Sequence, residues 1–132
     1  MPSPLEESVS LGRAEDWKMV EIFDPVTLGM ITLPIKKVPG RDDLMIAFTA
    51  EGSPRAISAL CPHRRLRLEE FARAGRAPGT IVCSAHSCVF NVATGVCINS
   101  HELSEAIPNL QSWSMVKDAD DLWTMDQDEV PK

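Results

Sequence analysis

Residues 60–86, LCPHRRLRLEEFARAGRAPGTIVCSAH, hold two short motifs that each join a cysteine to a histidine. The first motif places Cys61 two positions before His63, and the second places Cys83 three positions before His86. Thiolate and imidazole donors together favour zinc, copper or iron over ions that prefer oxygen ligands. The repeated pairing of one sulfur with one nitrogen therefore indicates a metal centre or a reactive cysteine.

Three kinds of site could use these four side chains. A structural zinc site usually pairs cysteine with cysteine and histidine with histidine along the chain, whereas each motif here is mixed. A nucleophilic cysteine activated by a neighbouring histidine would use one motif and leave the other without a role. An iron–sulfur cluster is the third interpretation and the preferred one. A zinc-binding interaction module stays open as an outside alternative.

The order C-x-H, a spacer, then C-x-x-H resembles the motif of the Rieske [2Fe–2S] family. The resemblance implies one [2Fe–2S] cluster, with Cys61 and Cys83 on one iron and His63 and His86 on the other. Each loop would then give one ligand to each iron, which explains why both motifs are mixed.

The segment after the second motif extends the resemblance. Residues 86–95, HSCVFNVATG, are similar to the family's H-x-x-x-F-D-x-x-T-G hairpin, with Phe90, Thr94 and Gly95 matching and Asn91 at the usual aspartate. Residues 107–109, IPN, resemble the proline-containing loop that covers the cluster in this family. The 19-residue spacer between the motifs is slightly longer than usual, and a longer loop costs little entropy.

Short apolar segments separated by Gly, Pro and Asp turns predict an all-β fold. Strands or hairpins are expected over 17–23, 29–38, 44–50, 55–60, 79–83, 87–100 and 111–126, with a short helix or irregular excursion within 64–78. We expect one domain over 1–132, a small Rieske-type antiparallel β-sandwich or barrel. Its inserted cluster-binding subdomain of two loops and a hairpin spans 60–100. Residues 1–14 are expected to be a loose arm, and 127–132 a tail.

Composition and charge limit the partners of the protein. The net charge is −6 and the pI about 5.0, which argues against a nucleic-acid partner. No apolar run approaches the roughly 20 residues of a membrane helix, and no secretory signal precedes the first strand. The four cysteines do not indicate a disulfide scaffold, because cysteines close to histidines more often mark a metal or catalytic site in a reducing compartment. We therefore expect a cytoplasmic monomer with no membrane partner.

The resemblance implies one-electron transfer at low potential. Two thiolates leave the oxidised cluster neutral, and an electron adds more easily to a neutral cluster than to an anionic one. High-potential members raise the potential further with hydrogen bonds from a Ser and a Tyr, where this chain has Cys88 and Phe90. They also carry a disulfide between the cluster loops, where this chain has Leu66 and Ser84. We expect a reduction potential within about 100 mV of −150 mV, the lower end of the range for such centres.

The expected role is to pass electrons from a flavin-dependent reductase to a terminal oxygenase, as an electron-transfer protein and not as an enzyme. An oxygenase also needs a mononuclear iron site, commonly two histidines and a carboxylate, and only His101 remains beyond the four ligands. The alternative is a Rieske small subunit of a larger oxidoreductase, such as an assimilatory nitrite reductase.

The sequence also suggests roles for several residues outside the four proposed ligands. Cys88 is expected to be a buried packing residue, although a cross-strand disulfide to Cys97 is conceivable. Arg65 and Arg67, with Arg64, form either a solvated face or a rim beside the cluster. The three tryptophans are expected to pack in the core or along its edge.

Overall fold

The computed structural model describes residues 8–62, 65–85, 87–99 and 107–126. The strands are β1 (Ser8–Gly12), β2 (Lys18–Asp24), β3 (Gly29–Val38), β4 (Arg41–Phe48), β5 (Pro54–Ser58), β6 (Ala72–Ala74), β7 (Thr80–Cys83), β8 (Cys88–Asn91), β9 (Ser112–Trp113), β10 (Met115–Lys117) and β11 (Trp123–Asp126). The helices are the 3₁₀ turn η2 (Ala14–Asp16) and α1 (Leu68–Phe71). No helix within these ranges is long and apolar enough to cross a membrane. The all-β expectation is confirmed.

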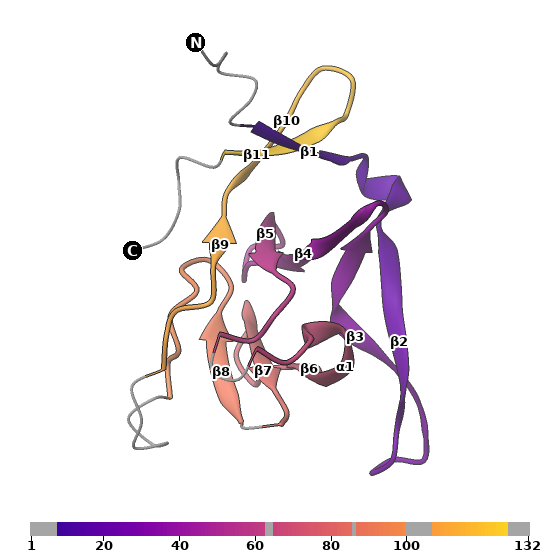
Figure 1. The fold of residues 1–132 in the computed structure, drawn as a ribbon, viewed down its shortest axis with the longest axis vertical. Helices are drawn as coiled ribbons and strands as arrows, with labels where there is room; N and C mark the ends of the chain where they lie inside the picture. Colours follow the sequence, from indigo (N-terminus) through magenta and orange to yellow (C-terminus); the bar gives the residue numbers. More distant parts are fainter. Residues whose placement is uncertain (1–7, 63–64, 86, 100–106, 127–132) are drawn as a thin grey trace.

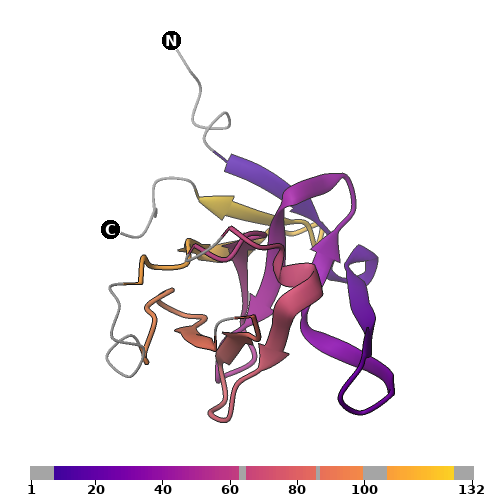
Figure 2. The ribbon, with the colours of Figure 1, turned by 60° about the horizontal axis from the view of Figure 1, so that its bottom comes forward.

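Three antiparallel sheets stack along the molecule (Figure 1). The five-stranded sheet has the order β2-β3-β4-β5-β9 and lies between two three-stranded sheets, β1-β11-β10 at one end and β6-β7-β8 at the other. Figure 2, with the lower end turned forward, shows the β2–β3 hairpin standing out from the body beside the β6-β7-β8 sheet. The predicted cluster-binding region therefore forms a small sheet of its own.

Strand β4 supplies side chains to two separate hydrophobic clusters. Met45 and Ala47 pack in the cluster between the five-stranded sheet and the β6-β7-β8 sheet. Leu44 and Ile46 pack in the cluster toward β1 and β11, with the buried Trp17. Successive side chains of a strand point to opposite faces, so a strand covered on both faces reads as an unbroken apolar run. This explains the continuous LMIA sequence.

Two local expectations need correction. Residues 8–12, expected in a loose arm, form β1 and pair with β11, because Leu11 is buried against the core. The arm after Asn91 is not a regular strand and returns through one bridge, Phe90 to Cys97. The excursion within 64–78 contains a short helix, as expected: the four-residue α1, which is followed by β6.

Other expectations hold. Strand β3 coincides with the predicted 29–38, and its pairing with β2 shifts register across Pro34, as a proline in a strand suggests. The C-terminal hairpin of β10 and β11 turns at Asp118 to Asp121, where Leu122 donates to the Asp118 side chain. Trp17 and Trp113 are buried, so the packing role expected for them is confirmed.

Candidate metal centre

Cys61 and Cys83 come from different loops and meet in the core. Both side chains are fully buried. A hydrogen bond with the Cys61 thiol, followed by burial, raises the pKa of the Cys83 thiol well above its ordinary value, and the nearby Cys88 adds to the effect. Two sulfur donors therefore converge on one point. The other two predicted ligands, His63 and His86, lie outside the described residues.

The two loops begin with the same backbone turn. The N–H of Arg65 donates to the carbonyl of Cys61 at 2.6 Å, and the N–H of Ser87 donates to the carbonyl of Cys83 at 2.8 Å. Arg65 and Ser87 both adopt left-handed conformations, with φ of 58° and 59°. Each loop thus contains one five-residue turn that starts at its cysteine, which places the two cysteines in equivalent positions.

Further backbone hydrogen bonds fix each loop to its surroundings. In the first loop, the N–H of Cys61 donates to the carbonyl of Leu66 at 2.8 Å. In the second loop, the N–H of Ser84 donates to the carbonyl of Phe71 in α1 at 2.8 Å. The short helix is therefore part of the site, because it ties the second loop to the segment that follows the first.

Asn99 supports the second loop, a role that was not predicted from the sequence. Its side-chain oxygen accepts from the N–H of Val89 at 2.9 Å, and its side-chain amide donates to the carbonyl of Ser87 at 2.7 Å. The thiol of Cys97 donates to the same oxygen at 3.3 Å. Asn99 is only one of several polar residues after the hairpin, so no local pattern distinguishes it.

The hairpin turn explains two features of the motif. The Asn91 side-chain oxygen accepts from the N–H groups of Ala93 and Thr94 at 2.8 and 3.3 Å, so an amide oxygen can serve where the family usually has a carboxylate. Gly95 has φ of +78°, and a Cβ there would lie 1.8 Å from the carbonyl oxygen of Leu110. Only glycine fits, because the 107–111 segment passes directly over the turn.

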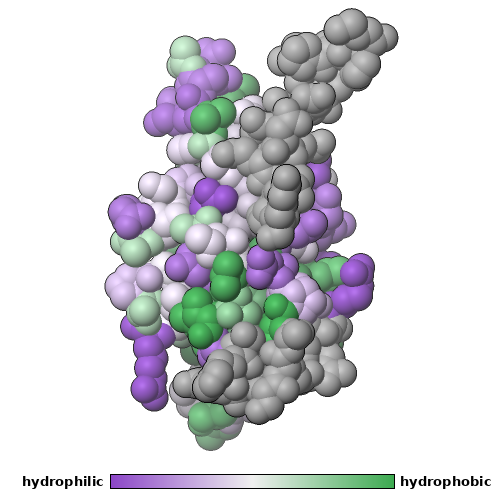
Figure 3. All heavy atoms as spheres, turned by 90° about the vertical axis from the view of Figure 1, so that its left-hand side faces the viewer, coloured by the Kyte–Doolittle hydropathy of each residue, from purple (hydrophilic) through white to green (hydrophobic). Residues whose placement is uncertain are grey.

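That segment also borders the first loop. A polar hollow of about 350 Å³ is lined by Ser58, Leu60, Cys61, Pro62, Arg65, Asn109 and Gln111. Asn109 thus lies beside the first loop, as the predicted covering segment requires. Apolar residues gather toward the lower end of the face shown in Figure 3, the end that carries β7 and β8.

The arginines after the first motif differ in role. Arg65 is exposed, whereas Arg67 is part-buried, pairs with Glu69 and donates to the carbonyl of Asp42 at 3.3 Å. Burial alone would raise the pKa of Glu69, but hydrogen bonds and positive charge from Lys37, at 3.1 Å, and from Arg67 lower it. Arg67 therefore links α1 to the five-stranded sheet through its contacts with Glu69 and Asp42.

The remaining cysteines, Cys88 and Cys97, form no disulfide. Both are buried. Cys88 pairs directly with Cys83 across β7 and β8, so a third thiol lies beside the two predicted ligands. Phe90 is completely buried in the same cluster.

The described residues fit the sulfur end of a [2Fe–2S] cluster. Two buried thiols meet, and burial adds to the rise in the pKa of Cys83. A buried thiol with a raised pKa ionises when a metal binds it, which is how cysteine ligands are deprotonated in metal sites.

Comparison with known proteins agrees with this donor set. Residues 32–127 match the family described as "Rieske [2Fe-2S] domain", which indicates one [2Fe–2S] cluster. No curated protein matches the sequence significantly. Among solved structures, one match is the oxygenase and ferredoxin complex of carbazole 1,9a-dioxygenase, in which one oxygenase glutamine is replaced by asparagine. The TM-score is 0.59 at 15% identity, over 92% of this chain and 28% of the matched chain. The match shows the fold and concerns one part of a longer chain.

Proposed function

Because this chain belongs to the Rieske [2Fe–2S] domain family, we propose that it is a one-electron carrier between a flavin-dependent reductase and a terminal oxygenase. The observation that carries the proposal is the meeting of the buried Cys61 and Cys83 thiols within the matched region. The protein is an electron-transfer component, and the oxygenase chemistry belongs to another chain.

The proposed ligands are Cys61 and Cys83 on one iron and His63 and His86 on the other. When bound, the cluster supplies reversible one-electron chemistry. The chain keeps both cysteine side chains buried, and the turns that end at Arg65 and Ser87 fix the loops that carry them. Phe90 is buried and carries no hydroxyl, so it offers no hydrogen bond to a sulfur, which supports the proposed low potential.

The proposed partners and location follow from the comparison, the charge and the cysteines. One solved structure with a similar fold is a complex of an oxygenase with a ferredoxin, which supports an oxygenase as the partner of this chain as well. The net charge of −6 supports a protein partner over nucleic acid. Four cysteines that form no disulfide suit the cytoplasm. We propose a monomeric carrier.

The decisive experiment is visible and EPR spectroscopy of the purified protein, before and after reduction by dithionite, with iron and sulfide analysis. A brown, EPR-silent oxidised form, and a reduced form with a rhombic EPR signal of mean g about 1.9, would support mixed Cys/His ligation. A colourless protein that contains zinc would contradict the electron-carrier proposal.

The ligand assignment has its own matched control. Cys61→Ser and Cys83→Ser should lose most of the cluster, whereas Cys88→Ser should keep it, although Cys88 is equally buried and pairs with Cys83. His86→Cys should keep a cluster but lower its potential, because a third thiolate on the cluster, the first on that iron, adds negative charge. An unchanged potential would remove His86 from the ligand set.

A further inference from the structure

The β2–β3 hairpin exposes an unusual amount of apolar surface. Eight large apolar side chains are exposed within the described residues, and five belong to this hairpin or its turn: Met19, Phe23, Val26, Leu28 and Met30. Val26 and Leu28 are 87% and 77% exposed. Phe23 and Met30 lie directly opposite each other across the two strands and so share one face.

The fold does not need these side chains for its core. The opposite face of the hairpin already packs inward through Val20 and Leu33, with Ile22 and Ile31 packed against the same cluster. A strand with one buried face normally carries polar residues on the other. A group of exposed apolar side chains on one hairpin, such as the Phe23–Met30 pair and the turn residues Val26 and Leu28, is typical of a binding site.

The end of the hairpin stands over a hollow that reaches the second cysteine loop. The hollow has a volume of about 630 Å³. Its lining includes Phe23 and Val26 from the hairpin, Glu70 and Arg73 from α1 and β6, and Ser84 and Ala85 from the second loop. Ser84 and Ala85 are the two residues between Cys83 and His86. A protein seated here would therefore touch the loop that carries two of the proposed ligands.

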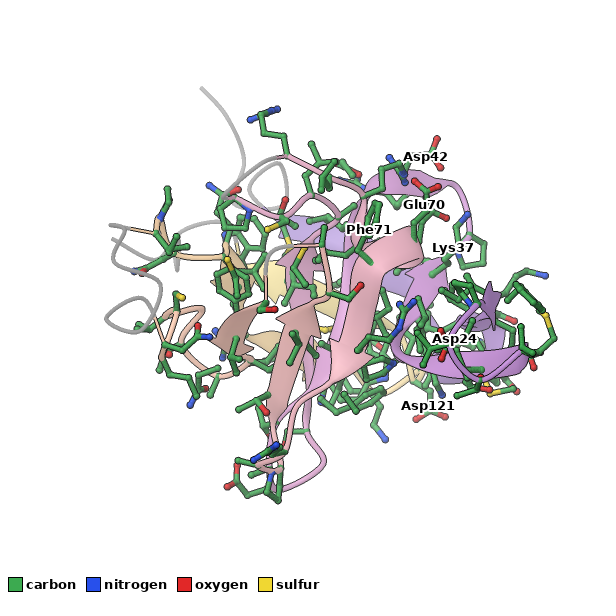
Figure 4. The ribbon with its side chains drawn as sticks, turned by 90° about the horizontal axis from the view of Figure 1, so that it is seen from below. Asp24, Lys37, Asp42, Glu70, Phe71 and Asp121 are labelled. Carbon is green, nitrogen blue, oxygen red and sulfur yellow. The ribbon has the colours of Figure 1, made fainter. Side chains whose placement is uncertain are left out.

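Viewed from below, Figure 4 shows Glu70 and Phe71 on α1, with Asp24 across from them on the hairpin. In Figure 1, the end of the hairpin and the turn between β7 and β8 lie at the same lower end of the molecule. The apolar surface and the second loop therefore face a partner that approaches from this end.

The charges around the hollow indicate the chemistry of that partner. The carboxylate of Asp24 accepts from the N–H of Val26 and the hydroxyl of Thr27, at 3.1 and 3.3 Å, so it is held at the hairpin end. The exposed carboxylate of Glu70 has no ion pair or hydrogen bond among the described residues. Arg73 donates to the carbonyl groups of Glu70 and Ala72. A basic side chain on the partner would pair with Glu70.

We propose that the outer face of the β2–β3 hairpin and the adjoining hollow form the docking surface for the protein electron acceptor. This inference rests on the proposed function. The acceptor presents an apolar surface to Phe23 and Val26 and a basic side chain to Glu70. Apolar contact supplies affinity, and the charge pair supplies orientation and faster association.

The test uses the reduced holoprotein with two acceptors, a basic c-type cytochrome and ferricyanide. One electron passes from the reduced protein to the ferric haem, which gives ferrous haem and oxidised protein. Phe23→Ser/Val26→Ser should slow the second-order reaction with the cytochrome by about fivefold or more. The reaction with ferricyanide, which needs no docking surface, and the reduction potential should not change.

The matched control is Val116→Ser on β10, a side chain that is 65% exposed at the opposite end of the molecule. It should leave both rates unchanged. Glu70→Lys should slow the cytochrome reaction and weaken its dependence on salt. Equal cytochrome rates for the hairpin variant and wild type, in a protein that still reduces ferricyanide, would overturn the docking surface alone. A protein with no reducible cluster would overturn the proposed function together with it.

Discussion

Arg65 and Ser87 hold the same place in two loops that differ in sequence and spacing. Each lies four residues after a buried cysteine, donates its N–H to the carbonyl of that cysteine, and adopts a left-handed φ near 60°. The first loop has one residue between Cys and His, and the second has two. The common feature of the loops is therefore the turn and not the spacing of the ligands.

The left-handed turn predicts an order of stability for substitutions at Ser87. Ser87→Gly should keep the free energy of unfolding within about 1 kcal/mol of wild type, because glycine adopts positive φ without strain. Ser87→Val should cost roughly 1–2 kcal/mol more, because a β-branched residue is strained there. Urea denaturation of the holoprotein measures both values. Equal stability of the two variants would contradict the assigned strain.

Ser112 joins the five-stranded sheet to the cluster hairpin. Its buried hydroxyl accepts from Nε of Arg55 and donates to the carbonyl of Val92, both at 2.7 Å. Ser112→Ala should lower the free energy of unfolding by about 1–3 kcal/mol, because it removes both hydrogen bonds in a water-free site. Ser53→Ala is the control, since Ser53 is exposed and its hydroxyl bonds to no described residue. A similar loss of unfolding free energy in both variants would show that the Ser112 hydrogen bonds do not join the sheet to the hairpin.

Gly95 is predicted to be irreplaceable for steric reasons beyond its φ. In Gly95→Ala, the new Cβ would meet the Leu110 carbonyl, so we expect a loss of at least about 2 kcal/mol and a less stable cluster. Gly40 has nearly the same φ, +79°, and open space around it. Gly40→Ala should therefore cost only the backbone strain, about 1 kcal/mol. Thermal unfolding followed by loss of visible absorbance compares the two.

Glu69 is predicted to make stability depend on pH in the acid range. Its pKa in the folded protein lies below the ordinary 4.5. The ionised carboxylate therefore stabilises the fold above that value, and this contribution is lost as the pH falls through the folded-state pKa. Glu69→Gln should cost roughly 1 kcal/mol at pH 7 and much less at about pH 3. A constant difference for Glu69→Gln across this range would contradict the ion-pair account.

Much of the fold follows from local patterns in the sequence. The alternation and turn residues predicted β2, β3 and the β10–β11 hairpin, because a strand with one buried face repeats every two residues. The apolar LMIA run of β4 was also recognisable, since a strand between two hydrophobic clusters is apolar on both faces. The short β1 was missed, because its pairing with β11 joins opposite ends of the chain.

By itself, the sequence determined which residues can act as ligands, because the paired Cys and His motifs restrict the metal chemistry through residue type and spacing alone. Only the tertiary structure decided how those residues are held. The meeting of Cys61 with Cys83, the support of the second loop by Asn99, and the passage of Leu110 over Gly95 all join segments far apart in the chain. Such contacts depend on how the sheets pack, and packing is a property of the whole chain that no local pattern of residues encodes.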